Sequence, residues 1–356
     1  MVSLGTGKTV SRLQQLLKGW GNSKFLTLNS ERDIIDRFQL TPIGEMLKNN
    51  LRDEFVRGDG ETAVYEGGCG LSLNENLQFV KDAFSVQLPF GIVTEKILSN
   101  ETIPINESIK LKLPTGSNLS RSYFVSPSSS REYMYKTQRQ RKIWWMRYAC
   151  DPGRFFISDP QQDNHSRGQS TTIQARLGGE EVTLEQIELI PGSEFRDELG
   201  DFHVEIGRSG KPIIPDVIRI RQCVELATLQ ILLDAYEVGG SSSVRIHRKL
   251  APFKCGIVCL VEGNASQMNE LYDLAKHLCS VLRRSNVTVL DCTNVSETVL
   301  AKQLHNLDAM GVPFSLILRL DSLSNGLFQL RSRDTTISET IHITDLPQYL
   351  LQIITN

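Results

Sequence analysis

Residues 131–156 have the composition of a surface that binds a charged polymer. They hold seven lysines and arginines against two acidic residues, with aromatic side chains interleaved. At about 100° per residue, a helix would place apolar side chains on one side and four cations on the other: Lys136, Arg139, Lys142 and Arg147. A basic face without a base-reading motif suits the phosphate backbone of DNA, whose binding depends on salt and not on base sequence. On composition alone, binding of a phosphate backbone by these four residues is one of two interpretations. The alternative is a solvated face on a core helix.

The two sides of this helix are not perfectly separated. Arg141 falls on the apolar side and Ile143 on the basic one. Trp144 and Trp145 lie on the apolar side, so we expect them in the core and not as stacking platforms. The helix should end near Asp151-Pro152-Gly153, because proline and glycine break the pattern.

The remaining candidates for chemistry predict no metal site, no cofactor and no catalytic nucleophile. The seven cysteines form no CxxC pair and no cluster with histidine, which argues against a zinc site and a disulfide framework. Cys255 and Cys259 are four residues apart in an apparent strand, so they face one side and are expected in the core. Residues 5–9, GTGKT, are not a phosphate-binding loop, because the first glycine of that motif would fall on Val2.

Length and charge predict the general organisation of the chain. The 356 residues carry a formal net charge of -2, which indicates about two globular domains with ample core. No apolar run approaches the length needed to cross a bilayer, so no membrane partner is expected. Residues 237–244, EVGGSSSV, have the composition of a linker. We therefore predict domains over residues 31–240 and 241–356.

The first thirty residues contain lysine and arginine but no acidic residue. Their apolar residues Val10, Leu13, Leu17 and Trp20 can share one helical face. A basic amphipathic start of this kind predicts a mitochondrial transit segment over residues 1–30. The alternative is an ordinary basic first helix.

The last hundred or so residues alternate between two periodicities. Strands are predicted over residues 250–261, 287–290, 314–320 and 327–331, and helices over residues 266–284, 295–309 and 346–354. This alternation favours an α/β unit with a mixed sheet covered by helices. Asn325-Gly326 predicts a tight type I′ hairpin turn, because these residues readily accept positive φ at both central positions.

Several phrases carry a resemblance to a known family. LAPFK at residues 250–254, DAMGVPF at 308–314 and LRSRDTT at 330–336 resemble the anticodon-binding domain of class II aminoacyl-tRNA synthetases of the glycyl, prolyl and histidyl group. The closer resemblance is to the accessory-subunit family of the mitochondrial DNA polymerase, DNA polymerase gamma. In that family the segment reads Asn-Gly-Leu, two further residues, then LRSRDTT, as residues 325–336 do here. WWMRYACDPGRFFISD at residues 144–159 is also similar to the family. This resemblance favours double-stranded or primer-template DNA as the partner of Lys136, Arg139, Lys142 and Arg147.

The resemblance implies a fold and a function. The fold would be a degenerate class II synthetase-like antiparallel-sheet domain followed by an anticodon-binding-like mixed-sheet α/β domain. The function would be that of a non-catalytic processivity factor in the mitochondrial matrix and nucleoid, which binds the polymerase catalytic chain and strengthens its hold on primer-template DNA. The resemblance places partner binding on five C-terminal residues: Gly326, Leu327, Arg331, Arg333 and Asp334.

The same resemblance bears on the oligomeric state. Vertebrate members of the family carry a long helical insertion that makes a homodimer, where only residues 56–87 are available here. An intertwined bundle needs several long amphipathic helices. We therefore expect a heterodimer with the catalytic chain and not a homodimer.

An enzyme is the competing class. A class II active site grips ATP with an arginine in a Phe-Arg-x-Glu motif and another at a glycine-rich helix start, because triphosphate needs fixed positive charge and close backbone approach. Residues 195–198 match the first pattern, but residues 215–233 contain no glycine. We therefore predict no synthetase activity and expect Arg219, Arg221 and Glu225 in the charged first turn of a buried helix. The alternatives are a diverged mitochondrial aminoacyl-tRNA synthetase and a tRNA-binding module.

Overall fold

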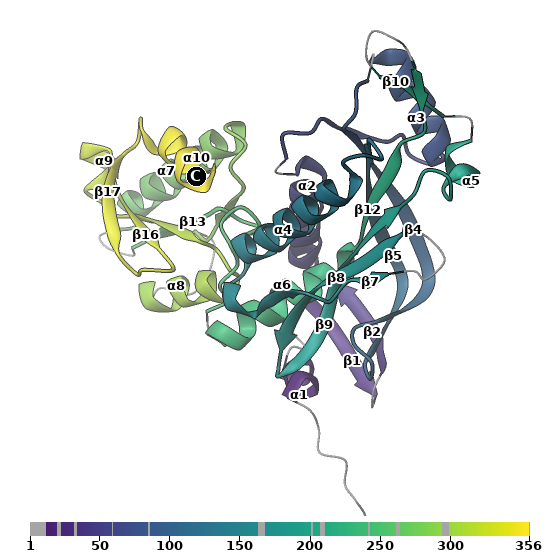
Figure 1. Ribbon diagram of the computed structural model, residues 1–356. Coiled ribbons are helices and arrows are strands. Elements are labelled where there is room, and N and C mark those ends of the chain that lie inside the picture. The colour runs from purple at the N-terminus through teal and green to yellow at the C-terminus, as the bar shows by residue number, and fades with distance from the viewer. Residues whose placement is uncertain are drawn as a thin grey trace, which may run out of the picture. The chain divides into compact units, whose positions relative to one another are not determined.

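The computed structural model describes residues 12–19, 23–31, 34–58, 60–84, 86–162, 168–200, 202–206, 211–240, 243–260, 264–293 and 299–355. The described chain divides into two compact units (Figure 1). One comprises residues up to 40, 51–147 and 151–230, and the other residues 41–50, 148–150 and 231–356. The predicted boundary at residue 240 stays a prediction.

The first unit is built on a sheet that has ten strands among the described residues. Its main path runs β1-β2-β5-β12-β9-β8-β6, with β4 on β5, β3 on β4 and β7 on β8. The strands are β1 (Leu26–Glu31), β2 (Ile34–Leu40), β3 (Val64–Glu66), β4 (Phe90–Pro104), β5 (Lys110–Val125), β6 (Phe155–Ile157), β7 (Gln161–Gln162), β8 (Gln169–Leu177), β9 (Glu180–Ile190) and β12 (Asp216–Cys223). Pairing is antiparallel except between β2 and β5 and between β3 and β4. A large antiparallel sheet is the core predicted for a synthetase-like domain.

Helices and a small hairpin complete the chain before residue 240. The helices are α1 (Arg12–Gly19), α2 (Pro42–Arg57), α3 (Leu73–Ala83), α4 (Ser130–Tyr148), the 3-10 turn η1 (Pro152–Arg154), α5 (Arg196–Leu199) and α6 (Val224–Gly239). The hairpin pairs β10 (Val204–Ile206) with β11 (Lys211–Ile213). As predicted, α4 ends before Asp151-Pro152, where the Asp151 side chain accepts a hydrogen bond from the Gly153 amide and the chain turns.

The N-terminal residues that are described belong to the fold. Leu13 and Leu17 of α1 are fully buried, as are Phe25 and Leu26 beside β1. Removal of all thirty predicted transit residues would take these side chains out of the core. Residues 1–11 lie outside the described part of the chain, and the transit segment stays a prediction.

The second unit has a five-stranded mixed sheet in the order β14-β13-β15-β16-β17 within its described residues. The strands are β13 (Cys255–Cys259), β14 (Val289–Asp291), β15 (Phe314–Leu318), β16 (Leu327–Ser332) and β17 (Ser338–His342). The helices are α7 (Ala265–Arg284), α8 (Leu300–Ala309), α9 (Ser322–Asn325) and α10 (Leu346–Thr355). Side chains of α7 and α10 form one core with alternate strand residues, and those of α8 form another with the opposite set. The predicted fold class of a mixed α/β unit covered by helices is therefore confirmed, and Cys255 and Cys259 lie in the core as expected.

Two local predictions are wrong. The connection between β15 and β16 is not a type I′ turn, because residues 322–325 form the helical turn α9 and only Gly326 has positive φ, at 68°. Gly326 therefore caps a helix, a position that also favours glycine. The second concerns Arg219 and Arg221, which lie in the central strand β12 and not in the first turn of a helix.

Candidate functional site

Helix α4 carries the four cations predicted to bind DNA. Lys136, Arg139 and Arg147 are exposed and Lys142 is half-buried. The nearest carboxylate to the Lys136 amine is that of Glu61, at 4.0 Å. A surface contact of this length is screened by water and salt, so it leaves the charge of Lys136 available to an anion.

The opposite side of α4 fixes the helix to the sheet. Trp144 meets Phe55 edge-on with ring centroids 6.5 Å apart, and Trp145 stacks on Phe155 at 6.0 Å. Both tryptophans are buried, which confirms the prediction that they belong to the core. Ile143, predicted on the basic side, is 56% exposed. The packing therefore holds the cations of α4 on a rigid helix.

A buried group of charges lies beneath α4. Arg141 forms a bidentate pair with Glu185 of β9, and its guanidinium lies 4.2 Å from the Trp144 ring centroid. Arg121 of β5 is 2% exposed, and two of its three guanidinium nitrogens have no hydrogen-bond partner. Burial, opposed by Tyr123 and reinforced by Arg141, lowers the pKa of Arg121. Glu185 therefore balances the charge of Arg141, one of two buried cations at this site. The sequence pattern indicated this group only by placing Arg141 on the apolar side.

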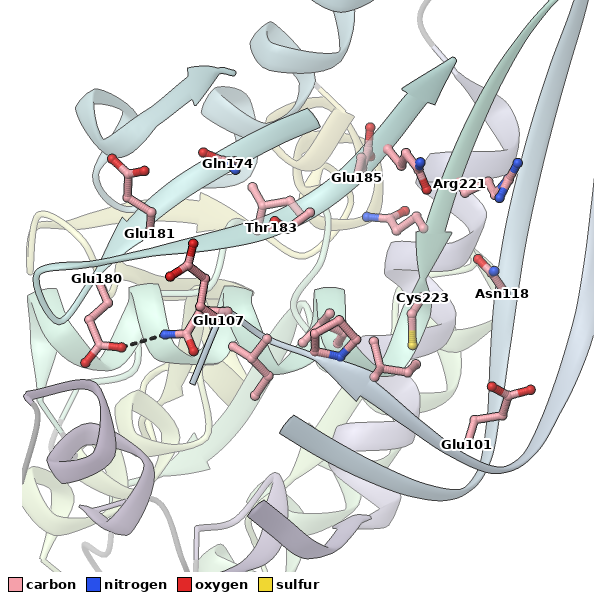
Figure 2. A pocket seen from close by; sticks show the side chains of 18 of the residues that line it. Glu101, Glu107, Asn118, Gln174, Glu180, Glu181, Thr183, Glu185, Arg221 and Cys223 are labelled. Atoms are coloured by element: carbon pink, nitrogen blue, oxygen red, sulfur yellow. Dashed lines mark hydrogen bonds between the residues drawn. The ribbon is translucent and has the colours of Figure 1, made fainter. Parts of the chain in front are cut away.

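A cavity of about 930 Å³ opens on the sheet of the first unit. Its lining residues include five glutamates from the β4 to β5 hairpin and from β9, all labelled in Figure 2: Glu101, Glu107, Glu180, Glu181 and Glu185. Asn106 donates a hydrogen bond to Glu180 at 2.5 Å. Among the residues that line this cavity, carboxylates thus outnumber the one arginine, Arg221.

The arginines near the cavity are already paired. Arg221, which lines it, donates to Glu188 at 2.5 Å. Arg219, on the same strand, donates to Glu198 at 2.6 Å. Triphosphate binding needs fixed positive charge, and this cavity presents carboxylates instead. The arginine that lines the cavity is therefore engaged within the sheet.

The five C-terminal residues predicted to bind a partner are placed differently from one another. Gly326 lies between α9 and β16, and Leu327 next to it is 41% exposed. The Asp334 side chain is 58% exposed. Both terminal guanidinium nitrogens of Arg331 donate to the Asp308 carboxylate, at 3.0 Å each. Gly326, Leu327 and Asp334 are therefore accessible, whereas Arg331 is engaged within the unit.

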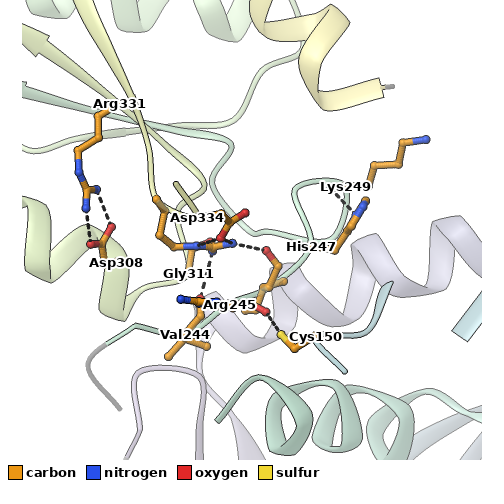
Figure 3. A network of polar contacts seen from close by, with 11 residues as sticks. Cys150, Val244, Arg245, His247, Lys249, Asp308, Gly311, Arg331 and Asp334 are labelled. Atoms are coloured by element: carbon orange, nitrogen blue, oxygen red, sulfur yellow. Dashed lines mark hydrogen bonds and ion pairs between the residues drawn. The ribbon is translucent and has the colours of Figure 1, made fainter. Parts of the chain in front are cut away.

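Arg333 is buried and joins several parts of the second unit. It is 5% exposed and donates to the carbonyl oxygens of Val244, Ile246 and Gly311 at 3.1, 2.9 and 2.8 Å. It also donates to Asp334 at 2.8 Å. Figure 3 shows this network. Since all of its guanidinium nitrogens are used internally, Arg333 holds the segment around residue 245 in place.

The same network contains a thiol that sequence reasoning missed. Cys150 donates a hydrogen bond from its sulfur to the Arg245 carbonyl at 2.6 Å (Figure 3). Its amide donates to Asp234 at 2.6 Å. Burial, and then Asp234, raise the pKa of the Cys150 thiol to about 12. This thiol stays protonated at neutral pH, so its role here is structural.

No group of three or more metal-ligating side chains occurs among the described residues. Within the same residues, no helix is long and apolar enough to span a bilayer.

Comparisons with known proteins identify relatives of both parts of the chain. The anticodon binding domain family matches residues 254–353. The mitochondrial DNA polymerase subunit gamma-2 of Drosophila melanogaster is 37% identical over 260 residues, which cover 70% of this chain and 70% of that protein. DNA polymerase subunit gamma-2 of Mus musculus is 28% identical over 294 residues, which cover 76% of this chain and 61% of the mouse protein. A glycine-tRNA ligase of Alkaliphilus oremlandii is 23% identical over 359 residues, which cover 95% of this chain and 74% of the ligase.

Proposed function

This chain belongs to the mitochondrial DNA polymerase subunit gamma-2 family, and from that premise we propose that it binds the polymerase catalytic chain and strengthens its hold on primer-template DNA. It is a mitochondrial protein with an accessory role and a synthetase-like ancestry. The 37% identity to the Drosophila subunit is the observation that carries the proposal.

The basic face of α4 supports the DNA-binding part of the proposal. Three of its four cations are exposed, in contrast to the buried Arg141 of the same helix. Cations on a rigid helix neutralise phosphates and release counterions, which gives affinity without base specificity. A processivity factor must hold any sequence, so this mode of binding fits the role.

The acid-lined cavity supports a role without catalysis. A ligase of this ancestry must hold ATP, and the cavity on the sheet of the first unit is lined by Glu101, Glu107, Glu180 and Glu181. Like charges repel a triphosphate in a partly desolvated site. Amino-acid-dependent exchange of pyrophosphate into ATP is the assay for the competing function. The proposal predicts background exchange with all amino acids, and exchange above background would establish a ligase.

The accessible residues Gly326, Leu327 and Asp334 are proposed to belong to the surface that meets the catalytic chain.

Between α2 and β4 the described residues contain only the short strand β3 and the 11-residue helix α3. That segment offers little for a helical dimer bundle. We therefore propose a complex with one copy of each chain. Light scattering on the purified complex should give the summed mass of one catalytic chain and one accessory chain, and a mass with two accessory chains would refute this stoichiometry.

A further inference from the structure

Strand β17 forms an edge of the second unit's sheet, and its hydrogen bonds show which groups it leaves open. Ile343 donates to the Gly326 carbonyl at 2.9 Å, and Ser332 donates to the Ile337 carbonyl at 3.0 Å. Opposed residues in an antiparallel pair alternate between bonded and non-bonded. The register Ile341 to Phe328 therefore places the odd-numbered residues of β17 in bonded pairs with β16.

The even-numbered residues of β17 direct their N–H and C=O groups away from β16. These are Ser338, Thr340 and His342, opposite Arg331, Gln329 and Leu327. In the described part of the chain, no strand pairs with this side of β17. Ser338 and Thr340 thus each offer an unpaired N–H and C=O along one line, and His342 offers its N–H, since its carbonyl accepts from the Asp345 amide at 3.1 Å. Such a line of open groups is a template for an added strand.

This edge lacks the charges that usually protect an open strand. Its one ionised residue, Glu339, accepts a hydrogen bond from the Tyr349 hydroxyl of α10 at 2.6 Å, so the carboxylate is held on the face that α10 covers. Ser338 and Thr340 are exposed and uncharged. Ile337, just before the strand, is 69% exposed and Leu327 is 41% exposed.

The charges around the edge select the kind of partner. Asp334 and Asp345 are exposed acidic residues on either side of β17, and Glu339 lies within the strand. The neighbouring arginines, Arg331 and Arg333, are both engaged inside the unit. Exposed carboxylates beside this edge repel DNA and attract a basic peptide.

We propose that the open edge of β17 accepts an extended, basic segment of the polymerase catalytic chain as an added strand. Main-chain hydrogen bonds to Ser338, Thr340 and the N–H of His342 supply affinity. Ile337 and Leu327 supply apolar contact, and the acids select lysine or arginine. This inference rests on the proposed function, since it names the manner in which the same partner binds.

Thr340→Pro tests the inference with little risk to the fold. Proline removes the N–H of a residue that gives no hydrogen bond to β16, a position at which edge strands tolerate proline. Thr340→Val keeps the N–H and is the matched control. With the purified catalytic chain, Thr340→Pro should weaken binding by about tenfold, equivalent to about 1.4 kcal/mol, with wild-type melting behaviour. Thr340→Val should bind as the wild type does.

A charge pair at the same residue keeps the test decisive if proline disturbs the hairpin. Thr340→Lys should weaken binding to the catalytic chain and Thr340→Glu should not, because the partner segment is basic. The reverse order of affinities, or full affinity of a folded Thr340→Pro, would overturn the inference while leaving the proposed function intact. A wild-type protein that fails to bind the catalytic chain would instead defeat the proposed function. Edge-to-edge dimers of the free protein that Thr340→Pro abolishes would identify a second copy as the occupant and overturn the inference.

Discussion

Arg333 shows how a single side chain can support the second unit. Its guanidinium donates hydrogen bonds to the carbonyl oxygens of Val244, Ile246 and Gly311. Arg333→Met would leave these acceptors without a donor, and buried unsatisfied groups cost about 1 to 3 kcal/mol each before relaxation. We expect the free energy of unfolding to fall by about 2 to 4 kcal/mol. Urea unfolding measures it, and Arg319→Met, at an exposed position, should change it by less than about 0.5 kcal/mol. Equal effects of the two substitutions would contradict this role for Arg333.

The buried thiols predict a loss of stability in alkaline solution. Burial raises the pKa of Cys255 to about 12, whereas an exposed thiol ionises near about 8.5. Above that pH the unfolded chain releases a proton that the folded chain retains, so the thiol's contribution to stability, complete below about pH 8.5, is lost as pH rises toward 12. The free energy of unfolding should therefore fall less steeply between pH 8.5 and 10.5 in Cys255→Ala than in the wild type. Replacement of the exposed Cys69 should leave the slope unchanged, and a wild-type slope in Cys255→Ala would contradict the assignment.

At the scale of elements, Gly326 joins α9 to β16 and contacts the end of β17. It has φ of 68°, and a Cβ there would lie 3.0 Å from Nε2 of His342. A residue with a Cβ pays about 1 to 2 kcal/mol for this backbone region. Gly326→Glu should therefore displace His342 and weaken binding to the catalytic chain, with only modest loss of thermal stability. Binding and melting temperature are measured on one preparation, with Gly326→Ala as the control that adds the strain without the charge. A folded Gly326→Glu protein with full binding would place the interface elsewhere.

Helix α4 gives a prediction for DNA. Reversal of Lys136, Arg139, Lys142 and Arg147 to glutamate should weaken duplex binding evenly across sequences. The slope of log K against log salt should also become shallower by about 0.9 for each phosphate that the helix no longer neutralises. Fluorescence anisotropy over a salt series measures both quantities.

The control for this variant changes charge by the same amount elsewhere. It reverses four exposed strand residues of the first unit: Lys96, Lys110, Lys112 and Arg176. The control should keep most of the salt slope. If it lowers the slope as much as the α4 variant does, net charge and not the α4 face governs DNA binding.

The predictability of these elements from sequence follows from their physics. α4, α7 and α10 were found because their apolar faces repeat at helical spacing over ten or more residues. The turn at Asn325-Gly326 was misread, because glycine is favoured both in tight hairpins and after a helix, and only the tertiary pairing decides between them. β17 was missed because it is short and largely exposed. The sequence around Arg333 does not indicate that it is buried, since the carbonyl oxygens to which it donates lie 22 and more residues away.

The proposed function gives a synthetase-like architecture an accessory role in the whole molecule. The antiparallel sheet of the first unit and the mixed sheet of the second are kept, while carboxylates line the cavity on the larger sheet. Fold alone does not determine function. The proposed function rests on family membership, on the basic face of α4 and on the exposed residues near Gly326.

The length of DNA synthesised per binding event shows whether this protein is an accessory processivity subunit. The purified catalytic chain extends a labelled primer on a long single-stranded template at moderate salt, with excess trap DNA so that each enzyme binds once. Addition of this protein in equimolar amount should lengthen the products severalfold, and the gain should be lost with the four-residue α4 variant. Product lengths that do not change on addition of folded wild-type protein would contradict the assignment of an accessory processivity subunit.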